Sequence, residues 1–188
     1  MSLQDRPPSH LKRLPSNHYR GHAWVHWSMT IKDRKGGWLE SNMHSALREL
    51  LIHICSRYHI ACPAYCFMPD HAHFLWMGLS EESDQMLASK TFRKHWNQHL
   101  RGKGAFELQK QPYEHVLEET ERNDSAFEDT LLYILSNPEK AKLTDSWRDW
   151  SFLGAIVAGY PDLDPRNWGQ FLPDFWKLHH LEVERLRT

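Results

Sequence analysis

The sequence predicts an α+β fold of the ferredoxin-like, split βαβ type, with a third helix and a C-terminal extension added to it. Some segments alternate apolar and polar residues as strands do, and others repeat apolar residues at helical spacing. In chain order these segments read strand, helix, strand, strand, helix, strand, helix. The first six match the split βαβ order, so we expect an antiparallel sheet with two helices on one face.

The first half of this pattern begins with residues 22–31, where apolar side chains alternate with His26 and other polar ones, as in a strand. Ser41 is a candidate N-cap for an amphipathic helix over residues 42–58. Residues 60–67 and 71–77 read as two more strands. The turn at Pro69-Asp70 between them predicts a hairpin.

The second half begins with a helix that we expect to start at Ser83 or Asp84 and to run to Leu100. Its apolar stripe lies opposite a basic face, and glycines follow its end. Residues 113–117 form a short apolar stretch that predicts the fourth strand.

A third helix would start at Asn123 or Ser125 and end or kink at Pro138. Beyond it lie an aromatic stretch at 147–160 and a possible terminal helix over 171–187. We expect one domain over residues 1–188. Its parts would be an N-terminal arm (1–19), a core (20–145) and an aromatic C-terminal extension (146–188).

The composition is that of a soluble globular protein, with 40% hydrophobic and 25% charged residues. No apolar run approaches membrane-spanning length, and the N-terminus is too polar for a signal peptide. The three cysteines have no disulfide-framework spacing, which predicts reduced thiols in a cytoplasm. The net charge is only −1, and this gives no overall support for a nucleic-acid partner.

Local basic stretches nevertheless suggest phosphate contacts. Residues 85–106 carry basic side chains and no acidic ones. The candidate DNA-binding residues are Lys90, Arg93, Lys94, Arg101 and Lys103, together with Arg20 at the end of the N-terminal arm. The simpler interpretation is that these residues form ordinary solvated faces.

Two histidines, His71 and His73, stand either side of Ala72 in the third expected strand. Side chains alternate along a strand, so both imidazoles would project from the same face. Two imidazoles placed in this way can share a divalent metal ion. The alternative is a pair of histidines on a solvated sheet face.

A second pair, Tyr133 and Asn137, is spaced four residues apart, so on a helix both side chains lie on one face. The amide oxygen of Asn137 could join the two imidazoles around Mg²⁺ or Mn²⁺. The phenol of Tyr133 would then face a phosphate bound to that ion. Alternatively, Tyr133 packs in the core and Asn137 only ends a helix before Pro138.

Taken together, the two stretches resemble the REP-associated tyrosine transposases, which belong to the single-tyrosine HUH transposases (U is a hydrophobic residue). The stretches are Met68-Pro-Asp-His71-Ala-His73-Phe-Leu-Trp76 and Tyr133-Ile-Leu-Ser-Asn137-Pro138. The resemblance covers roughly residues 10–160. In two respects the chain departs from it. Asp70 stands where many relatives carry Asn, and the chain is less basic than most DNA-cutting enzymes.

The resemblance implies a metal-dependent endonuclease and strand transferase in the cytoplasm of a prokaryote, close to the nucleoid. His71, His73 and Asn137 would be ligands of Mg²⁺ or Mn²⁺. Tyr133 would be the nucleophile, joined to DNA as a 5′-phosphotyrosine. The partner would be single-stranded DNA or hairpin DNA from palindromic repeats, with no membrane involved. Relatives include dimers and monomers, so a homodimer is one of the two expected assemblies.

Two rival hypotheses remain open. A zinc site could be drawn from Cys62, Cys66, His71 and His73, although their spacing is not a common structural-zinc pattern and the two cysteines fit better as fillers of one strand face. A domesticated transposase could instead keep the fold and bind hairpin DNA without cutting it. The intact Tyr133 argues against this second hypothesis.

Overall fold

The structure, a computed structural model, describes residues 13–118, 122 and 124–187. Its centre is a five-stranded antiparallel sheet in the order β4–β1–β3–β2–β5. The strands are β1 (Trp24–Thr30), β2 (Ile60–Phe67), β3 (His71–Gly78), β4 (Tyr113–Val116) and β5 (Leu153–Ile156). The order of the first four strands is that of the split βαβ arrangement, and β5 extends the sheet beyond β2. The predicted fold class is therefore confirmed.

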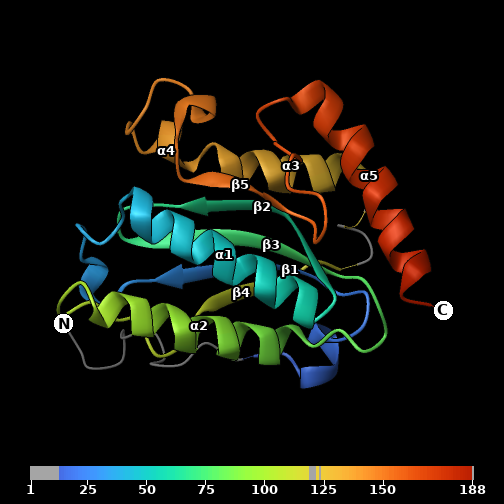
Figure 1. Ribbon diagram of the computed structural model, residues 1–188, viewed down its shortest axis with the longest axis horizontal. Helices are drawn as coiled ribbons and strands as arrows, with labels where there is room; N and C mark the ends of the chain where they lie inside the picture. Colours follow the sequence, from blue (N-terminus) through green and yellow to red (C-terminus); the bar gives the residue numbers. More distant parts are fainter. Residues whose placement is uncertain (1–12, 119–121, 123, 188) are drawn as a thin grey trace, which may run out of the picture.

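Helices cover both faces of this sheet (Figure 1). One face packs against α1 (Ser41–Arg57) and α2 (Gln85–Arg101), and the other against α3 (Asp124–Leu135) and α5 (Trp168–Arg185). The short elements are α4 (Asn137–Lys140) and the 3₁₀ helices η1 (Ser16–Tyr19), η2 (Lys32–Arg34) and η4 (Trp147–Asp149). Each face therefore has its own hydrophobic core.

The helix starts follow local capping chemistry. Asp84 caps α2, because its side chain accepts a hydrogen bond of 2.9 Å from the backbone N–H of Leu87. Ser41 is not the N-cap of α1: the helix begins at Ser41 itself, and no side chain caps its first turn. For α3, which begins at Asp124, the alternative start at Asn123 lies outside the described residues.

A register shift in β2 changes which side chains share a face. It lies between Ala61 and Ala64, where the chain contains Pro63. Proline cannot donate a ladder hydrogen bond, and strands with neighbours on both sides accept it only at such irregularities. The shift reverses the alternation, so Cys62 packs in the core under α1 and α2 while Cys66 packs in the core under α3. The expectation that both cysteines fill one face is therefore wrong.

The aromatic C-terminal residues form β5 and α5, which complete the α3 side of the molecule. The sequence did not predict β5, and α5 starts earlier than the expected residue 171. Phe175 of α5 stacks on Phe127 of α3 with ring centroids 5.5 Å apart, and Trp176 approaches the same ring at 4.7 Å. The α5 helix thus holds α3 against the sheet.

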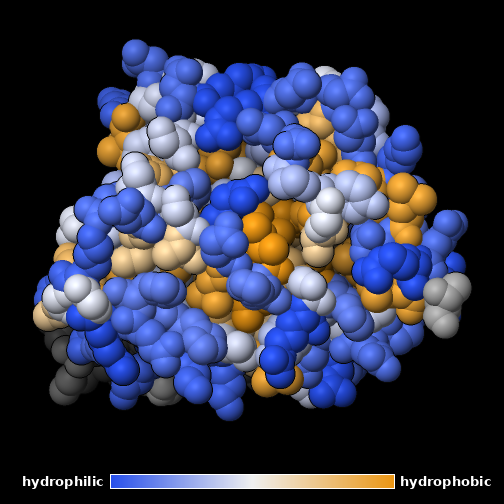
Figure 2. Space-filling view, viewed as in Figure 1, coloured by the Kyte–Doolittle hydropathy of each residue, from blue (hydrophilic) through white to orange (hydrophobic). Residues whose placement is uncertain are grey.

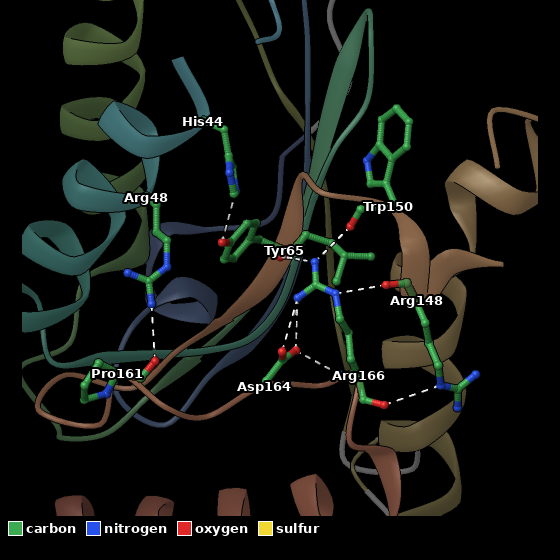
Figure 3. A network of polar contacts seen from close by, with 9 residues as sticks. His44, Arg48, Tyr65, Arg148, Trp150, Pro161, Asp164 and Arg166 are labelled. Atoms are coloured by element: carbon green, nitrogen blue, oxygen red, sulfur yellow. Dashed lines mark hydrogen bonds and ion pairs between the residues drawn. The ribbon is translucent and has the colours of Figure 1, made fainter. Parts of the chain in front are cut away.

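A polar network ties this C-terminal part to the core (Figure 3). The guanidinium of Arg166 donates to the carboxylate of Asp164 at 3.1 Å and to the backbone carbonyls of Trp150 and Arg148 at 2.9 and 3.0 Å. Arg48 of α1 donates to the carbonyl of Pro161 at 3.4 Å. Contacts therefore reach from the C-terminal loops to a helix on the opposite face of the sheet.

The face that carries α1 and α2 is mostly hydrophilic, with a patch of hydrophobic residues near the middle of the view (Figure 2). At the N-terminal end, residues 1–12 of the expected arm lie outside the described residues, whereas Tyr19 is buried beside Trp27 with ring centroids 5.9 Å apart. Among the helices of the described residues, none combines the length and the apolar character needed to cross a bilayer.

Candidate functional site

The two histidines of the motif lie side by side on β3, between β1 and β2. Ala72 and Phe74 face the α1–α2 core, so His71 and His73 project from the opposite face, toward α3. Their Nε2 atoms are 3.1 Å apart. Two ligands at about 2.1 Å from one ion, at right angles to each other, are themselves about 3 Å apart. The pair therefore has the spacing that a shared divalent ion requires.

The remaining ring nitrogen of each histidine has its own partner. Nδ1 of His71 contacts Oδ1 of Asp70 at 2.5 Å, and the other oxygen of Asp70 accepts from Arg34 at 2.8 Å. Nδ1 of His73 lies 3.1 Å from Nε2 of His26, on the neighbouring strand β1. The sequence pattern placed His26 on the polar face of its strand but gave it no role, because only the strand register brings it to His73.

Burial keeps two of these imidazoles neutral. It lowers the pKa of His73 to about 3, and the neighbouring histidines His26 and His71 lower it further. Burial, followed by the nearby His115, lowers the pKa of His26 to about 4. At neutral pH both rings therefore keep a nitrogen lone pair, which is the form that can bind a metal ion.

Asp70 stays ionised beside them. Burial alone would raise its pKa, but hydrogen bonds from His71 and Arg34 and the positive charge of Arg34 bring it below the ordinary value. The ionised Asp70 therefore accepts from Nδ1 of His71, whereas His73 lies at Nε2, on the opposite side of the same ring.

Tyr133 of α3 lies over the same histidines. Its ring meets those of His26 and His73 edge-on, with centroid distances of 5.7 and 5.9 Å. The side chain is 47% exposed, so the phenol is accessible and is not a core group. The ammonium of Lys140, from α4, is 4.8 Å from the centre of the Tyr133 ring. The structure thus brings together His71, His73 and Tyr133, as the motifs predicted.

Asn137 lies at the junction of α3 and α4. Its side-chain nitrogen donates to the carbonyls of Tyr133 and Ile134, at 2.7 and 3.2 Å. Because Pro138 has no N–H, it cannot donate to the Ile134 carbonyl, and the Asn137 amide does so instead. Both partners are acceptors, so the nitrogen must face them and the oxygen remains the atom able to bind an ion.

The candidate DNA-binding residues lie away from this cluster. Those of α2 belong to the helix layer on the opposite face of the sheet, and Lys90, Lys94 and Arg101 are exposed there. Others already have protein partners. Arg20 pairs with Asp84 at 3.0 Å, Lys103 pairs with Glu40, and Arg93 donates to the carbonyls of Gln109 and Lys110.

The rival zinc site does not form, because Cys62 and Cys66 lie in different cores. Within the part of the chain that the structure describes, no three or more His, Cys, Asp or Glu side chains are grouped so that they could hold a metal ion. The set His71, His73 and Asn137 contains only two residues of those types.

Comparisons with known proteins agree with this arrangement. Residues 20–102 match the family model described as "Transposase IS200 like". This range includes His71 and His73 but ends before Tyr133 and Asn137. A search of curated proteins finds no match.

A solved structure described as a "REP associates tyrosine transposase bound to a REP hairpin" superposes with a TM-score of 0.62 and is 22% identical. The match covers 77% of this chain and 81% of that one. The resemblance seen in the motifs is thus confirmed: residues 20–102 match the IS200-like transposase model in sequence, and the fold matches that of the REP-associated tyrosine transposase structure.

Proposed function

We propose that the chain is a metal-dependent endonuclease and strand transferase that acts on single-stranded or hairpin DNA. The observation that carries this proposal is the position of the exposed Tyr133 ring against His26 and His73. A solvent-accessible phenol beside two imidazoles spaced for one ion has the parts that a tyrosine nucleophile needs. The REP hairpin bound to the solved relative supports the choice of DNA as substrate.

The spacing of His71 and His73 supports a bound Mg²⁺ or Mn²⁺. His71 and His73 would hold it through Nε2, and Asn137 would add its amide oxygen. When bound, such an ion would polarise a phosphate oxygen and offset the negative charge that develops during the reaction. The proposal includes a single domain over residues 1–188, and it keeps two pairs of alternatives open: monomer or homodimer, and Mg²⁺ or Mn²⁺.

In the proposed reaction, the phenol oxygen of Tyr133 attacks the scissile phosphorus. The bond from phosphorus to the 3′ oxygen breaks, and that oxygen takes up a proton to become a free 3′-OH. The phenol proton passes to water or to a nearby base. A phosphotyrosine then holds the 5′ end of the 3′ piece, and it conserves the bond energy needed for a 3′-OH to rejoin the strand without ATP.

The exposed cations of α2 support a separate role in binding. Lys90, Lys94 and Arg101 lie on the other side of the sheet from Tyr133. We therefore assign them, together with Arg20, Arg93 and Lys103, to phosphate contacts along the hairpin stem, away from the scissile bond.

The test is a denaturing gel with Mn²⁺ and hairpin DNA labelled at its 3′ end, because the 3′ piece is the one that stays on the tyrosine. We expect the label to migrate with the wild-type protein, to be lost with EDTA, and to be absent for Tyr133→Phe and His71→Ala. Tyr113→Phe is the matched control, since Tyr113 of β4 is similarly exposed, at 51%. Its adduct should persist.

Two other results would reject the enzyme. Hairpin DNA retarded on a native gel, with no covalent band from any variant, would make the chain a DNA-binding protein. An adduct that survives in Tyr133→Phe would assign the nucleophile to another residue.

A further inference from the structure

Each candidate ligand histidine has a polar contact on the ring nitrogen that points away from the other histidine. For His71 this contact is the carboxylate of Asp70, at 2.5 Å from Nδ1. For His73 it is Nε2 of His26, at 3.1 Å from Nδ1. The two Nε2 atoms face each other across 3.1 Å. The contacts therefore form a line from Asp70 through His71 and His73 to His26.

The chemistry of a neutral imidazole gives this line a consequence. Such a ring carries one proton, on either Nδ1 or Nε2, and only the other nitrogen can bind a metal ion. To offer Nε2 to an ion, each histidine must keep its proton on Nδ1. An acceptor beside Nδ1 favours that tautomer and fixes the plane of the ring. The ionised Asp70 is such an acceptor, and His26 accepts through Nε2 when its own proton is on Nδ1.

Neighbouring elements hold both acceptors in place. Arg34 binds the second oxygen of Asp70 at 2.8 Å. His26 lies on β1, between β3 and β4, where its backbone is in register with Leu75 on one side and His115 on the other. Its ring also meets the ring of Tyr133. Asp70 is thus held by an exposed arginine, and His26 is held by its place in the sheet and by the ring of Tyr133.

We propose that Asp70 and His26 are the positioning residues of the metal site: each fixes the tautomer and orientation of one histidine so that both present Nε2 to the same ion. This inference rests on the proposed function, in which His71 and His73 hold the ion. It assigns roles to two residues that are not themselves ligands.

The test measures Mn²⁺ binding by the full-length protein without DNA, from the loss of the free-ion signal in electron paramagnetic resonance. Removing the acceptor, in His26→Leu or Asp70→Ala, should weaken binding about 10–100-fold, the usual effect of losing such a partner. His26→Gln and Asp70→Asn keep a hydrogen-bonding group near the same place, so binding should return to within a few-fold of wild type. His53→Leu, on the exposed part of α1, is the matched control.

The outcomes separate this inference from the proposed function. If wild type binds no Mn²⁺, or binds it as tightly as His71→Ala, both fall together. If wild type binds but His26→Leu and Asp70→Ala bind equally well, only the positioning role is overturned. A deficit that Gln and Asn do not restore also overturns it. If a thermal melt shows that His26→Leu does not fold, Asp70→Ala and Asp70→Asn still test whether Asp70 positions His71.

Discussion

The ammonium group of Lys140 lies over the aromatic ring of Tyr133, the candidate nucleophile. The ammonium lies 4.8 Å from the ring centroid of Tyr133, although the two residues are seven positions apart in the chain. Beyond the end of α3 the chain continues through the short helix α4, which begins at Asn137 and ends at Lys140. An ammonium over an aromatic face is attracted by the ring electrons and restricts how the ring can turn.

Removing this ammonium should slow cleavage. We expect Lys140→Met to lower the single-turnover cleavage rate by about 2–5-fold, since an exposed cation–π contact contributes about 0.5–1 kcal/mol. Lys140→Arg keeps the cation and should stay close to wild type. The measurement is the rate of covalent adduct formation with saturating hairpin DNA. Lys142→Met is the control, and equal rates for Lys140→Met and wild type would show that the contact does not contribute.

At the residue scale, sequence spacing predicted part of the site and missed the rest for a physical reason. Alternation along one strand puts His71 and His73 together, and helical spacing puts Tyr133 near Asn137. His26 and His73 are 47 positions apart in the chain, so their contact follows only from the register between β1 and β3, which local sequence spacing does not give. For Asn137 the spacing allows a ligand or a helix end, and the structure shows the second of these directly.

At the scale of elements, α3 depends on α5 for its position. The rings of Phe127, Phe175 and Trp176 pack between the two helices, and Phe175 is fully buried. Because α3 carries Tyr133, the C-terminal extension supports the candidate nucleophile through its packing on Phe127. The extension therefore has a structural task that its distance from the motifs does not suggest.

Truncating Phe175 should reveal this task. We expect Phe175→Ala to lower the free energy of unfolding by about 3–5 kcal/mol, as for other buried phenylalanines, because it leaves a cavity between α3 and α5. Urea unfolding measures the change. Leu181→Ala on the same helix is the control: this side chain is 45% exposed, and its loss should cost no more than about 0.5 kcal/mol. A similar small change for both variants would mean that α5 does not hold α3.

Two kinds of pattern predicted the elements. The strand β1 and the helices α1 and α2 each have one face in a core, so the period of their side chains predicted them. The strands β2 and β3 are almost wholly buried, and the apolar runs on either side of the Pro69-Asp70 turn predicted them. The strand β5 has no period, because all four of its residues are buried. At Gly154 an added Cβ would lie 2.8 Å from the hydroxyl of Tyr65, so this glycine permits the close approach, a reason invisible in the local sequence.

At the scale of the whole molecule, charge is divided between two faces. The histidine cluster and Tyr133 lie on the α3 side of the sheet, while α2 presents exposed cations on the other side. The net charge of −1 hides this division. If the hairpin stem binds along α2, the DNA must pass around the sheet to reach Tyr133.

This division predicts that binding and cleavage respond to different substitutions. Lys90→Ala and Lys94→Ala should each weaken hairpin binding and reduce the slope of log affinity against log salt by about 1, as expected for one lost phosphate contact. The cleavage rate of DNA that is already bound should not change. Fluorescence anisotropy across a salt series measures the slope, with Lys177→Ala on α5 as the control. A slope equal to that of wild type would remove the residue from the DNA interface.

The attachment of Tyr133 to a helix that packs through aromatic rings has a mechanical consequence. In the proposed intermediate, the broken strand is a load carried by one side chain of α3. Any pull on that strand passes through α3 to Phe127 and on to Phe175 and Trp176 of α5. His71 and His73 lie on β3, the central strand of the sheet, and not on this path. In the proposed intermediate, the packing of α3 against α5 thus helps to set how long the bound DNA end stays close to the other end of the break.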